Sequence, residues 1–164
     1  MTDHITSVLI VDGDASFRRT VHDLIGKTQD MTVVGTTENT KEAIALARKL
    51  EPDVILLDAN VLGTNGLEPV QEIGQVSPNS KVIILGVCEQ ESLVLDALRK
   101  GAWGHLVRGK DGADEMLEAI RVVHRGWTFL SPRIAGQVLD QVVRGRRRAA
   151  LSEDQRTDEW QMSA

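Results

Sequence analysis

Cysteine is almost absent from this chain of 164 residues, since Cys88 is the only one. A single thiol excludes an internal disulfide framework and a zinc site with several cysteine ligands, and it fits a reducing cytoplasm. The sequence also lacks a long apolar span and an amino-terminal signal pattern, so we expect a cytoplasmic protein with no membrane association. His4, His22 and His124 show no mutual spacing typical of a metal site, and surface positions are expected for them.

A dominant basic surface is missing as well. The formal net charge is −5, which argues against a body that binds nucleic acid. Four arginines lie between residues 146 and 156, but four acidic residues between 153 and 159 offset their charge. We therefore interpret residues 145–164 as a charged, disordered tail and do not expect direct DNA binding by this chain.

Short apolar runs alternate with stretches of helical periodicity along most of the chain. Three of them cover residues 8–11, 54–57 and 82–85, and they are followed by Asp12, Asp58 and Gly86. Such runs are typical of strands buried on both faces of a parallel sheet. Weaker patterns predict two more strands, at residues 104–107 and, on an edge, at 32–35. The alternation predicts an α/β fold: a doubly wound, five-stranded parallel sheet of order 2-1-3-4-5, flavodoxin-like or receiver-like, with five flanking helices.

A further, carboxyl-terminal helix is predicted beyond Gly126. Ser131 suits the cap position and Pro132 the first helical position, and an amphipathic stretch follows. The predicted organisation is a domain at residues 1–126, a linker with the additional helix at 127–144, and the tail at 145–164.

Two acidic residues, Asp12 and Asp58, each follow a strand that is predicted to be central. The carboxyl ends of parallel strands meet at one edge of the sheet, so these carboxylates are expected to lie close together. A hard cation such as Mg²⁺ would offset their repulsion and bring a phosphoryl group. An aspartate can act as a nucleophile toward phosphorus where a fixed cation neutralises the transferring oxygens, and Arg108 is the candidate cation.

Four stretches of the sequence resemble the receiver domain of bacterial two-component response regulators, most closely the NarL/FixJ (LuxR-type) class. They are residues 8–14, 53–67, 82–87 and 100–108, within a similarity that covers about residues 6–126. Together these signals are specific to the family, although each alone would be weak. The resemblance implies that Asp58 is the phosphoacceptor and that Asp12, Asp58 and the backbone of Asn60 bind a metal ion.

Two glycines depart from the family pattern. Gly13 replaces the second of two adjacent acids, which is commonly the direct metal ligand. Asp14 leaves the chain at a different angle and is expected to cap the following helix. Gly86 stands at the Ser/Thr switch position, so the hydroxyl that binds the phosphoryl group in the family is lost.

Two further departures lie on the last predicted strand or at its end. Arg108 stands at the lysine position of the family, and its forked guanidinium could pair with Asp58 or Asp12. His105 occupies the aromatic switch position, but the threonine that normally gates this ring is absent. Mg²⁺ binding is therefore expected to be weak at most, and no other cofactor is expected.

Three hypotheses for the function follow. The first is an atypical receiver module in phosphorelay signalling, not an enzyme, which acts by contact with a signalling protein or as a homodimer. In it, Arg108 pairs with Asp58, and phosphorylation and metal binding are reduced or absent. The alternative is a conventional phospho-switch that a histidine kinase phosphorylates at Asp58. The third, a flavodoxin-like nucleotide-binding enzyme, is disfavoured because no glycine-rich phosphate loop follows the first strand.

The carboxyl-terminal sequence resembles the start of a second family module. Residues 151–154, Leu-Ser-Glu-Asp, resemble the opening of the helix-turn-helix domain of NarL/FixJ regulators. Only about a dozen residues follow, too few for that domain. Either the helix-turn-helix domain has been lost or the sequence is a fragment.

Overall fold

The computed structural model describes residues 4–63, 66–86, 91–108 and 112–145. Cys88, the arginine-rich segment and the sequence Leu-Ser-Glu-Asp therefore lie outside the described residues. Within the described parts of the chain, no helix is both long enough and apolar enough to cross a membrane.

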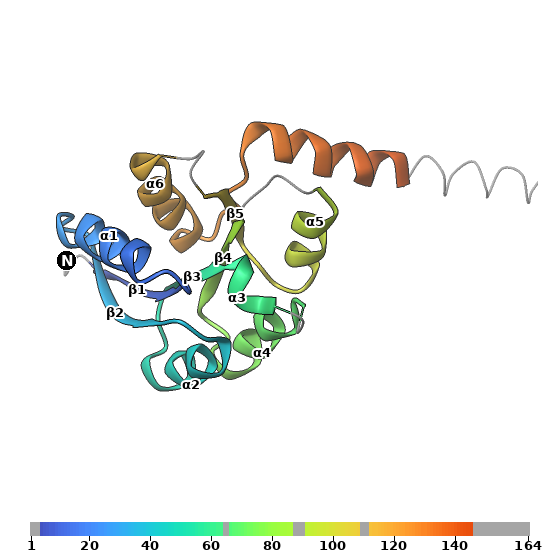
Figure 1. Ribbon diagram of the computed structural model, residues 1–164. Helices are drawn as coiled ribbons and strands as arrows, with labels where there is room; N and C mark the ends of the chain where they lie inside the picture. Colours follow the sequence, from blue (N-terminus) through green and yellow to red (C-terminus); the bar gives the residue numbers. More distant parts are fainter. Residues whose placement is uncertain (1–3, 64–65, 87–90, 109–111, 146–164) are drawn as a thin grey trace, which may run out of the picture. The chain divides into compact units, whose positions relative to one another are not determined.

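A five-stranded parallel sheet with the order β2-β1-β3-β4-β5 forms the centre of the fold (Figure 1). Its strands are β1 (Thr6–Val11), β2 (Met31–Thr37), β3 (Val54–Asp58), β4 (Lys81–Gly86) and β5 (Gly104–Val107). The predicted fold class and strand order are confirmed, with β2 on an edge. This edge strand is longer than predicted, and its pairing with β1 contains an irregularity after Val8.

Helices alternate with the strands, as the periodicity predicts, and the last one, α6, follows β5. They are α1 (Ala15–Gly26), α2 (Thr40–Leu50), α3 (Ala59–Leu62), α4 (Glu68–Val76), α5 (Glu91–Arg99) and α6 (Ala113–His124). The sequence pattern did not indicate α3, a single turn that begins directly after Asp58. A further helix over residues 132–145 begins at the predicted proline.

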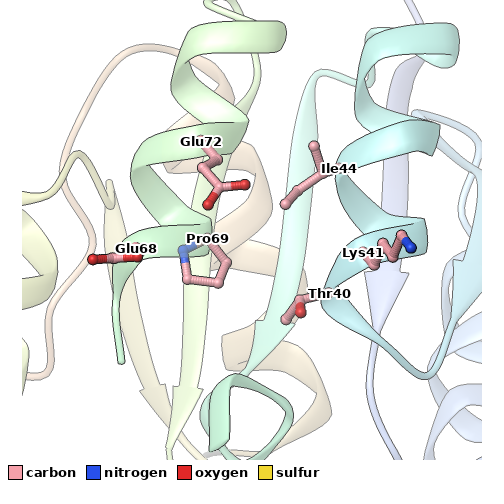
Figure 2. Close-up of a pocket in the computed structure, with 6 residues that line it drawn as sticks. All are labelled: Thr40, Lys41, Ile44, Glu68, Pro69 and Glu72. Atoms are coloured by element: carbon pink, nitrogen blue, oxygen red, sulfur yellow. The ribbon is translucent and has the colours of Figure 1, made fainter. Parts of the chain in front are cut away.

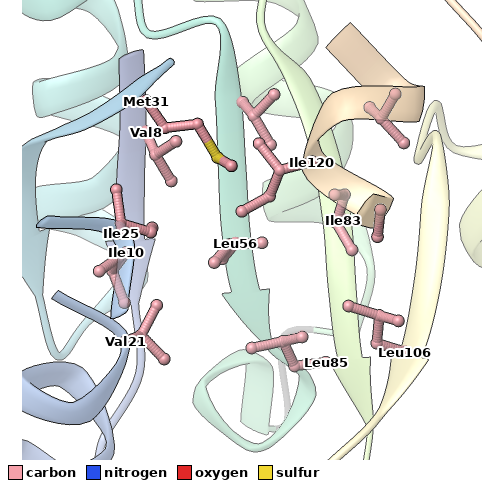
Figure 3. Close-up of a cluster of buried hydrophobic side chains, with 13 residues drawn as sticks. Val8, Ile10, Val21, Ile25, Met31, Leu56, Ile83, Leu85, Leu106 and Ile120 are labelled. Atoms are coloured by element: carbon pink, nitrogen blue, oxygen red, sulfur yellow. The ribbon is translucent and has the colours of Figure 1, made fainter. Parts of the chain in front are cut away.

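The two faces of the sheet bury separate hydrophobic clusters, because successive side chains of a strand point to opposite faces. Val8 and Ile10 of β1 pack in the cluster under α1 and α6 (Figure 3). Leu9 and Val11 of the same strand belong to the cluster that includes residues of α2 and α4. All four are fully buried, which explains the unbroken apolar run in the sequence.

The segment after α6 pairs with the free edge of β5. Phe129 forms a parallel bridge to Gly104, and its carbonyl accepts a hydrogen bond of 3.0 Å from the backbone N–H of His105. A Cβ atom on Gly104 would lie 3.2 Å from the Phe129 carbonyl oxygen, so a glycine permits this close approach. The first compact unit of the chain extends to Ser131 and a second begins at Pro132, while the predicted functional division at residues 126 and 145 stays a prediction.

Candidate functional site

The structure brings Asp12 and Asp58 together at the carboxyl edge of the sheet. Val11 of β1 lies opposite Leu57 of β3, so the next residue on each strand reaches the same edge. Nη1 of Arg108 lies 3.4 Å from Oδ2 of Asp12 and 3.7 Å from Oδ2 of Asp58. One guanidinium nitrogen is therefore shared by both carboxylates.

Arg108 directly follows β5 and is held on several sides. Its Nη2 lies 3.2 Å from Oδ2 of Asp14, which adds a third carboxylate to the site. Its Cζ lies 4.1 Å from the centre of the Phe17 ring, an arrangement that favours a cation–π contact. The side chain is only 20% exposed, so solvent screens these contacts less than it would screen a surface pair. The guanidinium is thus largely fixed between the acids and the first helix.

The loop after β1 supplies two of the three acids. Asp14 caps α1, as predicted, because its Oδ1 accepts hydrogen bonds from the backbone N–H groups of Ser16 and Phe17 at 2.9 and 3.3 Å. Its own N–H donates to Oδ1 of Asp12 at 2.8 Å. The contact of Asp14 with Arg108 was missed by the sequence reasoning, which treated the residue as a cap alone.

Burial dominates the electrostatics of Asp12. It raises the pKa of this carboxyl above its ordinary value, and the nearby charges of Asp58 and Asp14 raise it further. The N–H of Asp14 and the charge of Arg108 act in the opposite direction. Oδ2 of Asp12 accepts no hydrogen bond from the described residues, so its contact with the guanidinium is a charge interaction. Among the described residues, three carboxylates thus share the guanidinium of Arg108.

Asp58 ends β3 and also begins α3. Its Oδ1 accepts a hydrogen bond of 3.0 Å from the backbone N–H of Asn60, so it caps the short helix. Its side chain is 5% exposed. Its other oxygen, Oδ2, faces Arg108.

The residues at this edge do not fit a Mg²⁺ site as they stand. The ion would need the Oδ2 atoms of Asp12 and Asp58, and Nη1 of Arg108 already lies against both. Gly13 offers no carboxylate where the family has its second acid. A Cβ atom added at Gly13 would meet only Cγ2 of Val61, at 4.0 Å, so the backbone leaves room for the first atom of a side chain at this position.

The two residues that the resemblance places at switch positions, Gly86 and His105, lie on the neighbouring strands β4 and β5. Gly86 ends β4, and its carbonyl accepts a hydrogen bond of 2.7 Å from the backbone N–H of Arg108. His105 lies in β5 opposite Ile84 and is buried, with 3% of its surface exposed. The main chain at Gly86 thus positions the arginine, and Gly86 itself has no side-chain hydroxyl that could contact a phosphoryl group.

A separate pocket of about 260 Å³ lies between α2 and α4 (Figure 2). Its lining residues are Thr40, Lys41, Ile44, Glu68, Pro69 and Glu72. None of the residues around Arg108 lines it, and its charges are mixed. The pocket is therefore not part of the acidic site.

A parallel α/β sheet of this strand order, with two acids at its carboxyl edge and an arginine directly after the last strand, is the arrangement of a receiver-type signalling module. The family model described as the response regulator receiver domain matches residues 8–121. The chain belongs to the response regulator receiver family, and the resemblance noted in the sequence is confirmed.

Relatives among characterised regulators support a NarL/FixJ-type receiver. The chain is 34% identical over 131 residues to the response regulator GacA of Pseudomonas aeruginosa, covering 80% of this chain and 61% of GacA. It is 35% identical over 125 residues to the nitrate/nitrite response regulator NarL of Escherichia coli K12, covering 76% of this chain and 57% of NarL. The chain thus spans about three fifths of the length of these relatives.

A solved structure shares the same architecture. The LuxR-family two-component response regulator from Aurantimonas sp. SI85-9A1 is similar with a TM-score of 0.76 and 25% identity, covering 85% of this chain and 99% of that one. The match extends beyond the residues that the family model covers.

Proposed function

We propose that this chain is an atypical receiver module in which Arg108 supplies the charge that a metal ion and a lysine supply in the family. The observation that carries the proposal is the position of Nη1 of Arg108, 3.4 Å from Asp12 and 3.7 Å from Asp58. In this state the acidic site is held in one arrangement by an internal cation. Signalling then proceeds through protein contact.

The chemistry of arginine supports this proposal. A guanidinium stays charged at every physiological pH and presents several N–H groups in a rigid plane, whereas a lysine ammonium is a compact, mobile charge. Arg108 uses this plane to reach three carboxylates and stacks on Phe17. Displacing it to admit Mg²⁺ would break all of these contacts together.

Gly13 and Gly86 also support reduced metal binding and phosphorylation. Gly13 removes one metal ligand, and Gly86 removes the hydroxyl that would contact a transferred phosphoryl group. Both losses weaken phosphorylation without disturbing the strands, because each glycine lies at a strand end or in the loop beyond it. This chain can therefore keep the receiver fold while its phosphorylation chemistry is reduced.

A conventional phospho-switch is the second candidate, and the position of Asp58 favours it. The carboxylate ends β3, lies close to Asp12, and keeps the place of the phosphoacceptor in the family. In this candidate a histidine kinase is the phosphodonor, and Arg108 contacts the phosphoryl group after transfer.

Labelling with a small phosphodonor distinguishes the two candidates. The chain is incubated with acetyl phosphate, with and without Mg²⁺, and its intact mass is measured alongside that of the Asp58→Asn variant. The atypical module predicts no mass increase. Stoichiometric phosphorylation that needs Mg²⁺ and disappears in Asp58→Asn would establish the conventional switch instead.

The partners follow from the same proposal. We place the chain in the cytoplasm, in contact with a signalling protein or a histidine kinase, with a homodimer as the alternative, and we assign it no enzymatic activity. A part in transcription regulation is proposed from the GacA and NarL regulators that it resembles. Light scattering of the purified chain tests the homodimer.

A further inference from the structure

A second cluster of potential metal ligands lies at the amino edge of the sheet, opposite the acidic site. His4 precedes β1, Asp53 precedes β3, and His124 ends α6. The first two are neighbours because β1 and β3 pair in parallel. The helix α6 returns from the carboxyl end of β5, so that its own carboxyl end lies at this edge. Three chain segments that are far apart in sequence therefore meet.

The distances within this histidine–aspartate cluster are short. Nε2 of His4 lies 2.9 Å from Oδ2 of Asp53. The rings of His4 and His124 stack with centroids 5.5 Å apart and planes 17° apart. One ligand atom from each of the three residues lies within 4.8 Å of the other two. Modest side-chain rotations would bring all three atoms to one ion.

Asp53 is held in place by a neighbour that is not itself a ligand. The backbone N–H and the hydroxyl of Ser7 both donate to Oδ2 of Asp53, at 2.9 and 3.1 Å. The N–H of Asp53 donates in return to the Ser7 hydroxyl at 2.9 Å. Hydrogen bonds of this kind orient a metal ligand in advance and strengthen binding.

We propose that His4, Asp53 and His124 form a binding site for a divalent transition-metal ion of the zinc class. Two imidazoles and one carboxylate match the ligand preference of Zn²⁺, whereas Mg²⁺ and Ca²⁺ prefer oxygen ligands throughout. The His4 side chain is 68% exposed, which gives it room to adjust and leaves the fourth position open to water. The bound ion replaces the hydrogen bond between His4 and Asp53.

Metal binding at this edge would join the amino-terminal segment to β3 and to the end of α6. An ion that binds the folded chain stabilises it in proportion to the logarithm of its concentration above Kd. The site shares no residue with Asp12, Asp58 or Arg108. The proposed metal site is therefore independent of the proposed function. A negative result for Zn²⁺ binding would leave the proposed receiver function untouched.

Titration of the full chain, free of any affinity tag, with ZnCl₂ tests the proposal. Calorimetry should show one ion bound per chain, and the thermal unfolding midpoint should rise with Zn²⁺. His4→Ala and His124→Ala should each weaken binding by about tenfold or more. His22→Ala is the matched control, because His22 is an exposed histidine of α1 outside the cluster, and it should bind as the unmodified chain does.

Cobalt substitution supplies a readout that does not depend on stability. Co²⁺ should give a visible absorption band typical of nitrogen and oxygen ligands, and the band should be lost in the His4→Ala, His124→Ala double variant. Absence of Zn²⁺ binding overturns the proposal, and so does binding that the double variant retains or that His22→Ala weakens equally. MgCl₂ should change the thermal unfolding midpoint equally in the unmodified chain and in the two histidine variants, because the cluster is not expected to bind Mg²⁺.

Discussion

The two edges of the sheet hold buried or half-buried aspartates whose pKa values are shifted in opposite directions. At the carboxyl edge, burial and neighbouring acids raise the pKa of Asp12. At the amino edge, burial also raises the pKa of Asp53, but hydrogen bonds from Ser7 and His4 outweigh it and leave the pKa below its ordinary value. Strand position alone therefore does not decide the direction in which the pKa of an acid is shifted. The balance between burial and the hydrogen-bond donors that face the carboxylate decides it.

This difference indicates which edge can respond to a ligand. Three carboxylates share Arg108, so any change in charge there alters the balance of the whole site. Asp53 is already satisfied by hydrogen bonds, and an added ion at that edge would mainly join segments of the chain. We expect substitutions at the two edges to differ in both size and sign.

Removal of the shared cation should have the largest effect. Arg108→Leu leaves three acids without their common partner, two of them almost fully buried, and should lower the free energy of unfolding by about 3 kcal/mol at neutral pH. Urea denaturation followed by circular dichroism measures it. A loss no greater than that of an exposed arginine would show that the acids do not depend on Arg108.

Restoring the family residues should reopen the metal site. We expect Gly13→Asp combined with Arg108→Lys to bind Mg²⁺ about tenfold more tightly than the unmodified chain, a difference of about 1.4 kcal/mol. A Cβ atom at Gly13 meets no neighbour closer than 4.0 Å. Calorimetric titration with MgCl₂ measures the affinity, and Gly74→Asp, a change at another glycine with open surroundings on α4, is the control. Unchanged affinity in the double variant would place the obstacle to Mg²⁺ elsewhere than in Gly13 and Arg108.

The matched exchanges Asp12→Asn and Asp53→Asn should change stability in opposite directions. A raised pKa in the folded state means that stability falls as the pH rises from the unfolded value of 3.8 through the folded one, so Asp12→Asn should stabilise the chain at pH 7. A lowered pKa means that stability is present above the unfolded value and is lost as the pH falls through the folded one. Asp53→Asn should therefore destabilise the chain at pH 7, by about 1 kcal/mol.

Thermal unfolding of both variants between pH 3 and pH 7 checks this prediction. The stability of Asp12→Asn relative to that of the unmodified chain should increase as the pH rises from 3, and the difference should be greatest at pH 7. Equal signs for the two variants at pH 7 would show that the contrast between the edges does not extend to stability.

The sequence predicts most of the fold because apolar runs and helical periodicity report burial directly. It also predicts that Asp12 and Asp58 meet, since both follow central parallel strands. It does not predict α3, whose single turn depends on the cap that Asp58 provides rather than on a hydrophobic period. A short helix that is stabilised by one side-chain hydrogen bond cannot be predicted from hydrophobic periodicity.

The same reasoning fails where side-chain reach decides a contact. The prediction paired Arg108 with Asp58 or Asp12, and the structure adds Asp14 through the oxygen that is not used for capping. His4 and His124 were expected at unrelated surface positions, yet their rings stack. Their proximity could have been predicted from the topology. A helix that packs on a parallel sheet runs antiparallel to the strands, which brings the end of α6 to the edge where β1 begins.

An exposed ion pair tests whether the number of acids per cation is what distinguishes Arg108. Arg121 forms a one-to-one pair with Asp30, with hydrogen bonds of 2.7 and 3.1 Å, and the side chains are 39% and 50% exposed. The hydrogen bond from Arg121 lowers the pKa of Asp30, so the pair stabilises the fold above the unfolded pKa and loses this contribution in acid. Because water screens the pair, Arg121→Leu should lower the free energy of unfolding by only about 0.5 kcal/mol, and less at high salt. Urea denaturation at low and high NaCl measures both changes, and a loss as large as that of Arg108→Leu would show that burial and shared acids do not set Arg108 apart.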